Sequence, residues 1–317
     1  MRRYRDFNTY LKEIFGERVQ KISLDAGMNC PNRDGTLSTK GCIFCDARGS
    51  GTGAFSERNL SIEAQIEQAR RFYRKRYGAK MFIAYFQSFT NTYAPLHRLK
   101  GLYDRALAYP DMVGLAVGTR PDCIDRDILS LLGSYGSDRM VWIEYGLQSA
   151  HDATLRRINR GHNRAAFENA VMLAHEQGLN ICAHVILGLP GEDRDMMMDT
   201  ARYISGLPIR AVKIHLLYVV RGTPLADLYE SGRFRCLEPE AYAELAVDFL
   251  ERISPEVVVQ RITGDPAPRE LLAPAWALEK SRNLARIRET FEKRDARQGR
   301  LYKESVPGKG HFSFKDK

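Results

Sequence analysis

The chain has 317 residues, of which 44% are apolar, and this length suits one large α/β domain or two smaller ones. The sequence contains no apolar run of membrane-spanning length and no apolar segment after its charged start, so we expect a cytoplasmic protein without membrane contact. Its formal charge is +9, and its six cysteines, three of them within residues 30–45, are unlike the disulfide framework of a small secreted scaffold. Metal or catalytic use of the cysteines is favoured instead.

Short apolar runs rich in β-branched and aromatic residues alternate with longer stretches of helical periodicity. The expected strands are, in chain order, 21–26, 81–86, 112–117, 139–145, 180–187, 211–219 and 256–262. The expected helices between them are 61–77, 95–108, 125–132, 164–177, 193–205 and 239–253. Six or seven repeats of strand then helix predict an α/β fold with a parallel sheet, either a barrel or an open doubly wound sheet.

The residues that follow the expected strands combine turn-forming glycine or proline with polar side chains. These segments are 87–90, 118–122, 146–149, 188–192 and 221–224. In a parallel barrel all such segments lie at one face, where ligands bind. Turn formation alone would explain any one of them, but five at the same face favour a ligand site.

The first strand is followed by a loop that carries Cys30, Cys42 and Cys45 in the spacing C-x11-C-x2-C. A CxxC pair brings two thiolates to one metal or cluster from a single turn, and the distant Cys30 supplies the third. Structural zinc normally has four ligands, and His97, the nearest histidine, is more than fifty residues away along the chain. Three readings stay open: a 4Fe-4S cluster with one iron free for a cofactor, a zinc site completed by Asp46 or a remote side chain, and redox or structural thiols.

The loop resembles that of radical S-adenosylmethionine proteins of the elongator-like branch, in which a long first spacer replaces the commoner CxxxCxxC. Two segments resemble a family of small bacterial members linked to modification of the tRNA wobble uridine. They are the run from Ile22 through Gly41-Cys42-Ile43-Phe44-Cys45 and the later Thr119-Arg120-Pro121-Asp122. The resemblance extends over about residues 5–275. It implies a partial (β/α)6 TIM-like barrel, a 4Fe-4S cluster held by the three cysteines, and S-adenosylmethionine across the strand ends.

The resemblance also implies positions for cofactor-binding side chains. The segment 144–149 resembles a strand of oxygen-independent coproporphyrinogen oxidases and elongator-like enzymes, which gives Gln148 a cofactor contact. Arg160 falls where those enzymes place an arginine against the methionine carboxylate, although a surface arginine is the alternative. Gly188 and Leu189 resemble the turn that packs on the adenine, although a plain strand-to-helix turn would look the same.

Other candidates are less sharply defined. The chain lacks the Gly-Gly-Glu turn that binds the cofactor amino group in related proteins, so Ser88 or Thr90 is expected there instead. Thr119, with Arg120 and Asp122, is expected to face the ribose or the substrate, unless the Arg-Asp pair only ties the turn. Cys123 is a candidate hydrogen donor.

The family chemistry implied is reductive cleavage of S-adenosylmethionine to a 5'-deoxyadenosyl radical, with an electron from a donor such as flavodoxin or ferredoxin. The proposed partner is tRNA, and basic clusters at 2–5, 70–76 and 280–300 would attract its phosphates, although solvated helix faces carry similar charges. Two alternatives are a radical enzyme acting on a small molecule or tetrapyrrole, and a non-enzymatic, metal-stabilised RNA-binding module. We expect a core over residues 1–265 and a basic helical extension over 266–317, with a helix at 278–297 and an RNA-docking end at 307–317.

Overall fold

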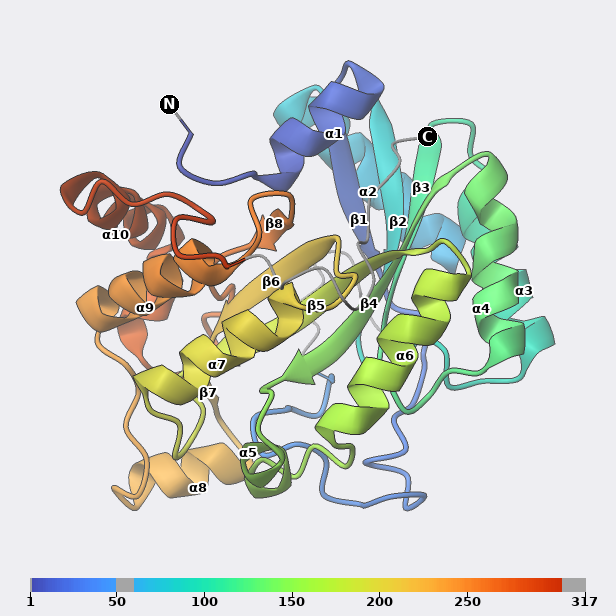
Figure 1. The fold of residues 1–317 in the computed structure, drawn as a ribbon. Helices are drawn as coiled ribbons and strands as arrows, with labels where there is room; N and C mark the ends of the chain where they lie inside the picture. Colours follow the sequence, from blue (N-terminus) through green and yellow to red (C-terminus); the bar gives the residue numbers. More distant parts are fainter. Residues whose placement is uncertain (1, 50–59, 304–317) are drawn as a thin grey trace.

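The structure is a computed structural model that describes residues 2–49 and 60–303 (Figure 1). The expected RNA-docking end at 307–317 lies outside the described residues. No described helix is long and apolar enough to cross a membrane.

Seven parallel strands form one sheet in the order β1-β2-β3-β4-β5-β6-β8. They are β1 (Val19–Leu24), β2 (Met81–Phe86), β3 (Met112–Thr119), β4 (Met140–Gln148), β5 (Asn180–Leu187), β6 (Ala211–Leu216) and β8 (Val258–Arg261). The strands follow one another without the reversal of order that defines a doubly wound sheet, and the sheet curls (Figure 1). Among the described strands β1 and β8 do not pair, which leaves a gap that we call the seam. The expected partial barrel is confirmed, and the open doubly wound alternative is wrong.

Six helices cover the outer face of the sheet (Figure 1). They are α2 (Ile62–Tyr77), α3 (Leu96–Leu107), α4 (Arg126–Ser134), α6 (Arg164–Glu176), α7 (Arg194–Ser205) and α9 (Pro239–Arg252). Four of them begin at a Ser, Asp or Asn whose side chain accepts a hydrogen bond from a backbone N–H of the first turn. All six helices occur where helical periodicity predicts them.

Several short elements were not expected from the sequence. They are α1 (Phe7–Phe15), the 3₁₀ helix η1 (Tyr135–Ser137), α5 (Asp152–Arg157), α8 (Pro224–Glu230) and η2 (Ala275–Leu278), together with an antiparallel pair of β7 (Val219–Val220) and β9 (Leu271–Ala273). The strand expected at 211–219 ends at Leu216, because the chain turns there and residue 219 pairs with β9 instead of continuing the sheet. Most of these pieces are too short for periodicity to reveal them, but α1 is as long as α4, and its apolar periodicity could have predicted it.

The amino-terminal end of the barrel is closed by α1, at the end opposite the cysteine loop (Figure 1). Phe7 and Tyr10 meet the buried Trp142 of β4 edge to face, with ring centroids 5.7 and 6.2 Å apart. Val19, Ile83 and other inward-facing residues complete this apolar floor. The interior of the barrel therefore opens toward the carboxyl ends of the strands and toward the seam.

The extension after residue 265 packs on the core through α10 (Lys280–Lys293), which lies beside α9 (Figure 1). Ile287 and Phe291 of α10 join the main hydrophobic core. The Arg294 guanidinium donates hydrogen bonds of 2.7 Å to both Asp248 and Glu251, two carboxylates of α9 that are almost fully buried. These buried carboxylates depend on arginines such as Arg294, because an unpaired buried charge costs several kcal/mol, on the order of 3–5.

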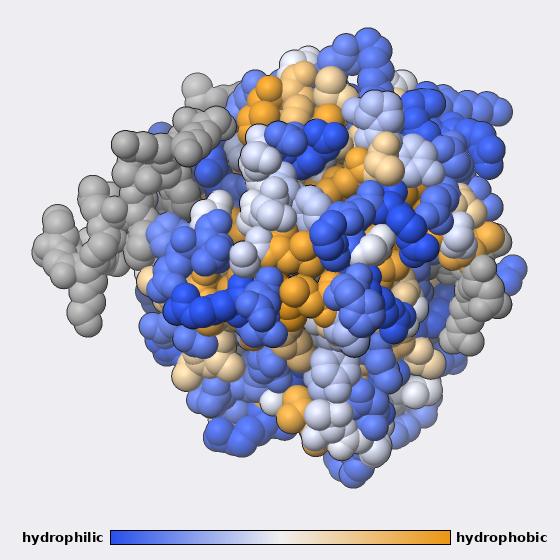
Figure 2. All heavy atoms as spheres, turned by 90° about the vertical axis from the view of Figure 1, so that its right-hand side faces the viewer, coloured by the Kyte–Doolittle hydropathy of each residue, from blue (hydrophilic) through white to orange (hydrophobic). Residues whose placement is uncertain are grey.

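Figure 2 presents the side of the molecule that carries α3 and α4. Hydrophobic residues gather near the middle of this face, and hydrophilic residues surround them. Such a mixture is ordinary for the exposed side of a helix layer.

Candidate active site

A cavity of about 1050 Å³ lies inside the partial barrel and reaches the carboxyl ends of the strands. Pockets for ligands of drug size hold about 300–1000 Å³, so this cavity has room for a nucleoside cofactor together with part of a substrate. Its walls contain all three loop cysteines, several of the expected cofactor-binding residues and the inward-facing side chains of the strands. The site expected from the sequence is therefore a continuous space.

The cysteine loop places its three thiols on this cavity. Cys30 and Cys42 are buried and Cys45 is partly exposed, and none of the six cysteines forms a disulfide. The backbone N–H of Cys45 donates to the carbonyl of Cys42 at 3.0 Å, which sets the CxxC pair in a turn. Gly41 precedes it with φ +69°, where a Cβ would lie 2.8 Å from the Arg33 side chain, so the position requires glycine.

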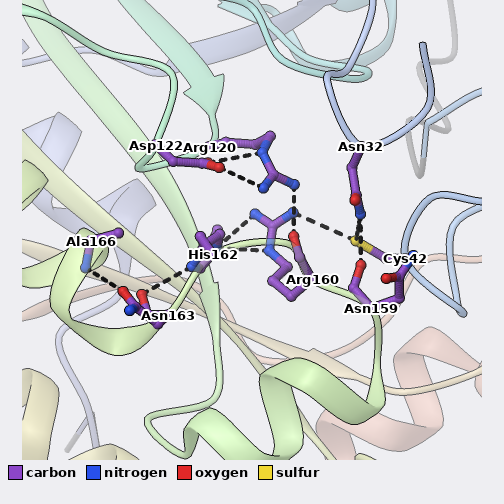
Figure 3. A network of polar contacts seen from close by, with 10 residues as sticks. Asn32, Cys42, Arg120, Asp122, Asn159, Arg160, His162, Asn163 and Ala166 are labelled. Carbon is purple, nitrogen blue, oxygen red and sulfur yellow. Dashed lines mark hydrogen bonds and ion pairs between the residues drawn. The ribbon is translucent and has the colours of Figure 1, made fainter. Parts of the chain in front are cut away.

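Two polar side chains direct donors at the Cys42 sulfur (Figure 3). The Asn32 amide nitrogen lies 3.7 Å from this sulfur and also donates to the Asn159 carbonyl at 2.6 Å. The Arg160 Nη1 atom lies 3.6 Å from the same sulfur. Hydrogen bonds to ligand sulfurs are typical of the surroundings of an iron–sulfur cluster, where they tune its potential. The residues present fit a bound cluster.

The spacing of the thiols bears on the choice between zinc and a cluster. Tetrahedral zinc with Zn–S bonds of about 2.3 Å places its thiolates about 3.8 Å apart. Among the described residues, the three loop sulfurs do not form a group in which all lie within 4.8 Å of one another. A 4Fe-4S cluster accommodates a wider set, because each thiolate binds a different iron. The geometry therefore favours a cluster over one zinc ion.

Gln148 and Arg160 lie together beside the cysteines. The register between β4 and β5 shifts at Gly146–Gln148, and Gln148 ends β4 with φ 76°, an unusual conformation for a residue other than glycine. Arg160 is buried and donates from Nη2 and Nε to the Gly146 carbonyl, at 2.7 and 3.2 Å. A Cβ on Gly146 would lie 2.5 Å from Arg160 Nη2 and 2.6 Å from Gln148 Nε2. Glycine at 146 is what allows both side chains to occupy this corner of the cavity.

The turn after β2 brings Ser88 and Thr90 to the cavity wall. Ser88 and Phe89 have φ values of 76° and 59°, so this turn uses the left-handed conformation twice without a glycine. The buried Thr90 hydroxyl has no hydrogen-bond partner within the described chain. An unpartnered buried hydroxyl on a cavity wall is suited to a ligand, and the expected contact of Ser88 or Thr90 with the cofactor amino group stays a prediction.

Thr119 also lines the cavity, but its hydroxyl is paired with that of Thr92 at 2.5 Å. Arg120, only 2% exposed, forms a two-bond contact with Asp122 at 2.9 and 2.8 Å and donates to the Arg160 carbonyl at 2.8 Å (Figure 3). The Arg-Asp pair thus ties the turn after β3 to the segment that carries Arg160. This is the structural alternative that the sequence left open.

Gly188 and Leu189 are not among the residues that line the cavity, to which β5 contributes His184 and Ile186. Leu189 is 2% exposed and belongs to a separate apolar cluster. Gly188 has φ +88°, and a Cβ there would lie 2.8 Å from Leu237, so packing already requires glycine. Their expected contact with adenine stays a prediction that would need a shift of this turn.

The pKa values of Cys123 and His162 are shifted from their usual range. Burial raises the pKa of the Cys123 thiol to about 12, so this thiol stays protonated, but it is not among the residues that line the cavity. Burial and the neighbouring Arg160 lower the pKa of His162 to about 3, and its Nε2 lies 3.1 Å from the Gly146 carbonyl. His162 therefore supports the β4 end as a neutral ring (Figure 3).

Sequence reasoning did not single out Asn32 and Asn159 as part of the site. Asn159 has φ 51°, and its amide donates to the Gly41 carbonyl at 2.6 Å, which joins the segment before Arg160 to the cysteine loop. The only signal in the sequence was position, since Asn32 stands two residues after Cys30 and Asn159 directly precedes Arg160. Neither belongs to a spacing pattern that reveals such a role.

A parallel half barrel with a three-cysteine cluster loop after its first strand defines a class of protein: enzymes that bind an iron–sulfur cluster and a cofactor at the strand ends. The family model described as the Radical SAM superfamily matches residues 32–204, and the model of the Radical_SAM C-terminal domain matches residues 209–293. The chain belongs to the radical S-adenosylmethionine superfamily. Members use a 4Fe-4S cluster and S-adenosylmethionine, and these are its cofactors.

Relatives in sequence cover nearly the whole chain. The chain is 39% identical over 301 residues to the uncharacterized protein YtqA of Bacillus subtilis, covering 95% of this chain and 93% of YtqA. It is 38% identical over 271 residues to protein YhcC of Escherichia coli, covering 85% and 86%. Human elongator complex protein 3 is 33% identical over 162 residues, which is 49% of this chain and 29% of that protein.

Among solved structures, the archaeal Elp3 of Methanocaldococcus infernus is similar with a TM-score of 0.62 at 17% identity. The match covers 88% of this chain and 64% of that one. At this identity the likeness concerns the fold, and it agrees with the partial barrel described above.

Proposed function

We propose that this enzyme modifies the side chain of a wobble uridine in tRNA. When bound, the cluster and S-adenosylmethionine supply a 5'-deoxyadenosyl radical that removes a hydrogen atom from the substrate. A donor such as flavodoxin or ferredoxin delivers the electron. The observation that carries the proposal is an aromatic and cationic strip where the cavity opens along the seam.

The chain's own residues orient the reactants and exclude water. Cys30, Cys42 and Cys45 would hold the cluster, and Arg160 and Gln148 would hold the cofactor on the same wall of the cavity. The Arg160 guanidinium donates to the Gly146 carbonyl, and Arg120 donates to the backbone carbonyl of Arg160, so both the side chain and the backbone of Arg160 are held in place. Preorganised groups of this kind lower the entropic cost of aligning the reacting atoms.

The strip is formed by side chains at the end of α2 and before β1. Phe72 and Tyr77 are 47% and 40% exposed, unusually open for large apolar side chains. Tyr73 stacks on Tyr77 with ring centroids 6.0 Å apart, and the Arg18 guanidinium lies 4.6 Å from the centre of the Tyr77 ring. All four residues line the cavity. Exposed rings flanked by cations are how proteins bind unpaired nucleotides, because every base offers a face for stacking.

The charge clusters are partly neutralised in the fold. Arg70 and Arg74 both bond to Asp111, at 3.0 and 2.7 Å, so neither is a free phosphate contact. Arg71 and Lys75 of the same helix are exposed and have no ion-pair partner within the described residues. They are the better candidates for phosphate contacts beside the strip.

The decisive experiment is nucleoside analysis of tRNA from cells with and without the gene. We expect one wobble-uridine species to disappear in the deletion strain and its precursor to accumulate. Wild-type protein should restore it and Cys42→Ala should not, because Cys42 would be a cluster ligand. An unchanged uridine profile would refute the tRNA assignment and favour the small-molecule alternative.

Direct binding gives a second test. Arg71→Glu should weaken tRNA binding several-fold and reduce its dependence on salt, because a lost phosphate contact releases fewer counterions. Arg98→Glu on α3 is a matched control, since it changes the net charge equally at an exposed arginine with no ion-pair partner in the described part of the chain. Equal effects of the two variants would mean that net charge, and not the strip, governs binding.

A further inference from the structure

Below the cofactor residues, the cavity continues to a layer of polar side chains in the middle of the barrel. Side chains alternate along a strand, so Glu144, Gly146 and Gln148 of β4 all face inward. At about 3.3 Å per residue, Glu144 lies about 13 Å before Gln148 along the strand, on the side of the closed end of the barrel. Lys21 of β1 and Lys213 of β6 reach the same depth from other strands and line the same cavity.

Glu144 is fully buried and receives contacts from three strands. Its Oε1 accepts from Lys21 at 2.5 Å, and its Oε2 accepts from Lys213 and, at 2.8 Å, from His184. Although burial alone would raise the pKa of Glu144, the two ammonium groups hold it well below its usual range. Burial lowers the pKa of Lys213 to about 8, which leaves this lysine mostly charged at neutral pH. Two ammonium groups therefore face one carboxylate.

Arg261 adds a third cation to this excess. It ends β8, lines the cavity, and has no ion-pair or side-chain hydrogen-bond partner among the described residues. Its charge contributes to lowering the pKa of His184 and His215, and burial is the largest cause for both rings. We call Lys21, Glu144, Lys213 and Arg261 the lumen layer. Within this layer three cations face one carboxylate, an excess of two positive charges. The other carboxylates that line the cavity are paired with different cations, Asp6 with Arg2, Asp46 and Glu270 with Arg48, and Asp265 with Lys280.

Two polar nitrogens around the lumen layer are unused. His215 Nε2 and Gln260 Nε2 are buried on the cavity wall and have no hydrogen-bond partner in the described part of the chain. The rings of His184 and His215 lie 5.2 Å apart between centroids, and burial holds the pKa of His184 at about 4. An unsatisfied buried polar group costs about 1–3 kcal/mol, so these atoms indicate a ligand that satisfies them.

A metal ion is a poor candidate for this ligand. Glu144, Cys182 and His184 do place one ligand atom each within 4.8 Å of one another. However, the Lys21 and Lys213 ammonium groups occupy the two Glu144 oxygens and would repel a divalent cation. Burial also raises the pKa of the Cys182 thiol well above its usual range, so no thiolate is available. The excess positive charge of the lumen layer favours an anionic ligand.

We propose that the lumen layer is a subsite for a carboxylate carried by the substrate, bound by Arg261 with neutral donors from His215 and Gln260. A planar guanidinium matches a carboxylate with two parallel bonds. A phosphate dianion would meet stronger repulsion from Glu144, which is already buried in the same layer. The group that enters the barrel is thus anchored at its anionic end, with its reacting carbon between the lumen layer and the cofactor.

This inference deepens the proposed function, because it rests on the substrate side chain entering this cavity, but its test needs no tRNA. Sodium acetate and inorganic phosphate serve as probes in calorimetric titrations of the anaerobically reconstituted holoenzyme, at constant ionic strength. We expect saturable binding of acetate and weaker binding of phosphate. Arg261→Gln should weaken acetate binding at least tenfold. Gln260→Glu should abolish acetate binding, because the new carboxylate still accepts from Lys21 and repels the acetate anion.

Arg98→Gln on the outer surface is the matched control for the loss of one arginine, and it should bind acetate as the wild type does. Circular dichroism confirms that each variant is folded, and the two lumen variants test the subsite independently. Absence of acetate binding to the wild type, or equal binding to Arg261→Gln, would overturn the subsite. Tighter binding of phosphate than of acetate would overturn the carboxylate assignment. If acetate binds as expected and the tRNA profile is unchanged, the tRNA proposal fails and the subsite stands.

Discussion

Replacing Gly146 by alanine perturbs the corner where Gln148 and Arg160 meet. The new Cβ would lie 2.5 Å from Arg160 Nη2 and 2.6 Å from Gln148 Nε2, whereas ordinary contacts begin near 3.4 Å. Both side chains therefore have to move by about 1 Å at their polar ends. The backbone at Gly146 does not have positive φ, so alanine strains the side chains and not the main chain.

The cost follows from the bonds that this movement breaks. Arg160 donates to the Gly146 carbonyl from two nitrogens, at 2.7 and 3.2 Å. A hydrogen bond from a charged group contributes about 1.5–3 kcal/mol, which corresponds to roughly a ten- to hundredfold change in an equilibrium constant. If Arg160 binds the methionine carboxylate, Gly146→Ala should weaken S-adenosylmethionine binding by that factor.

The assay is anaerobic titration of the reconstituted protein with S-adenosylmethionine, followed by measurement of 5'-deoxyadenosine formation. Gly101→Ala on α3 is the control, because a Cβ there has no heavy atom within 4 Å. It should leave cofactor binding unchanged and stabilise the helix by up to about 1 kcal/mol. Unchanged affinity and rate in Gly146→Ala would refute the placement of Arg160 and Gln148 against the cofactor.

Two further predictions concern stability. Asp122→Asn leaves the buried Arg120 without its charged partner and should lower the free energy of unfolding by about 3 kcal/mol in urea titrations. The control is Glu17→Gln, which removes an exposed ion pair with Lys80 and should lower the free energy of unfolding by less than about 1 kcal/mol. The pKa of His184 is about 4 in the folded protein and about 6.5 when exposed. Between these pH values His184 is protonated in the unfolded chain and neutral in the folded protein, so the free energy of unfolding should fall as the pH drops from 6.5 to 4. His184→Gln should reduce this loss of stability by on the order of 2 kcal/mol. If the free energy of unfolding depended on pH equally in the two proteins, the lowered pKa of His184 would be contradicted.

Local patterns in the sequence were sufficient to predict the repeating strands and helices of the fold. Periods of two and 3.6 residues report which side chains meet the sheet core, so all seven strands and the six covering helices were foreseeable. The spacing of Cys30, Cys42 and Cys45 pointed to a cluster because ligands on one loop are close in sequence as well as in space. Gln148 and Arg160 were expected on the cofactor from the resemblance to known enzymes and not from a local pattern, and Arg160 follows the short helix α5.

Tertiary structure alone decided what depends on contacts between distant segments. The closure of one barrel end by α1, the link from Arg120 to Arg160 and the packing of Leu189 in a separate apolar cluster all arise from contacts that no short period encodes. The lumen layer is the clearest case, because Lys21, Glu144, Lys213 and Arg261 stand on four strands up to 240 residues apart. Their charges meet only because a curled parallel sheet turns one face of every strand toward a common interior.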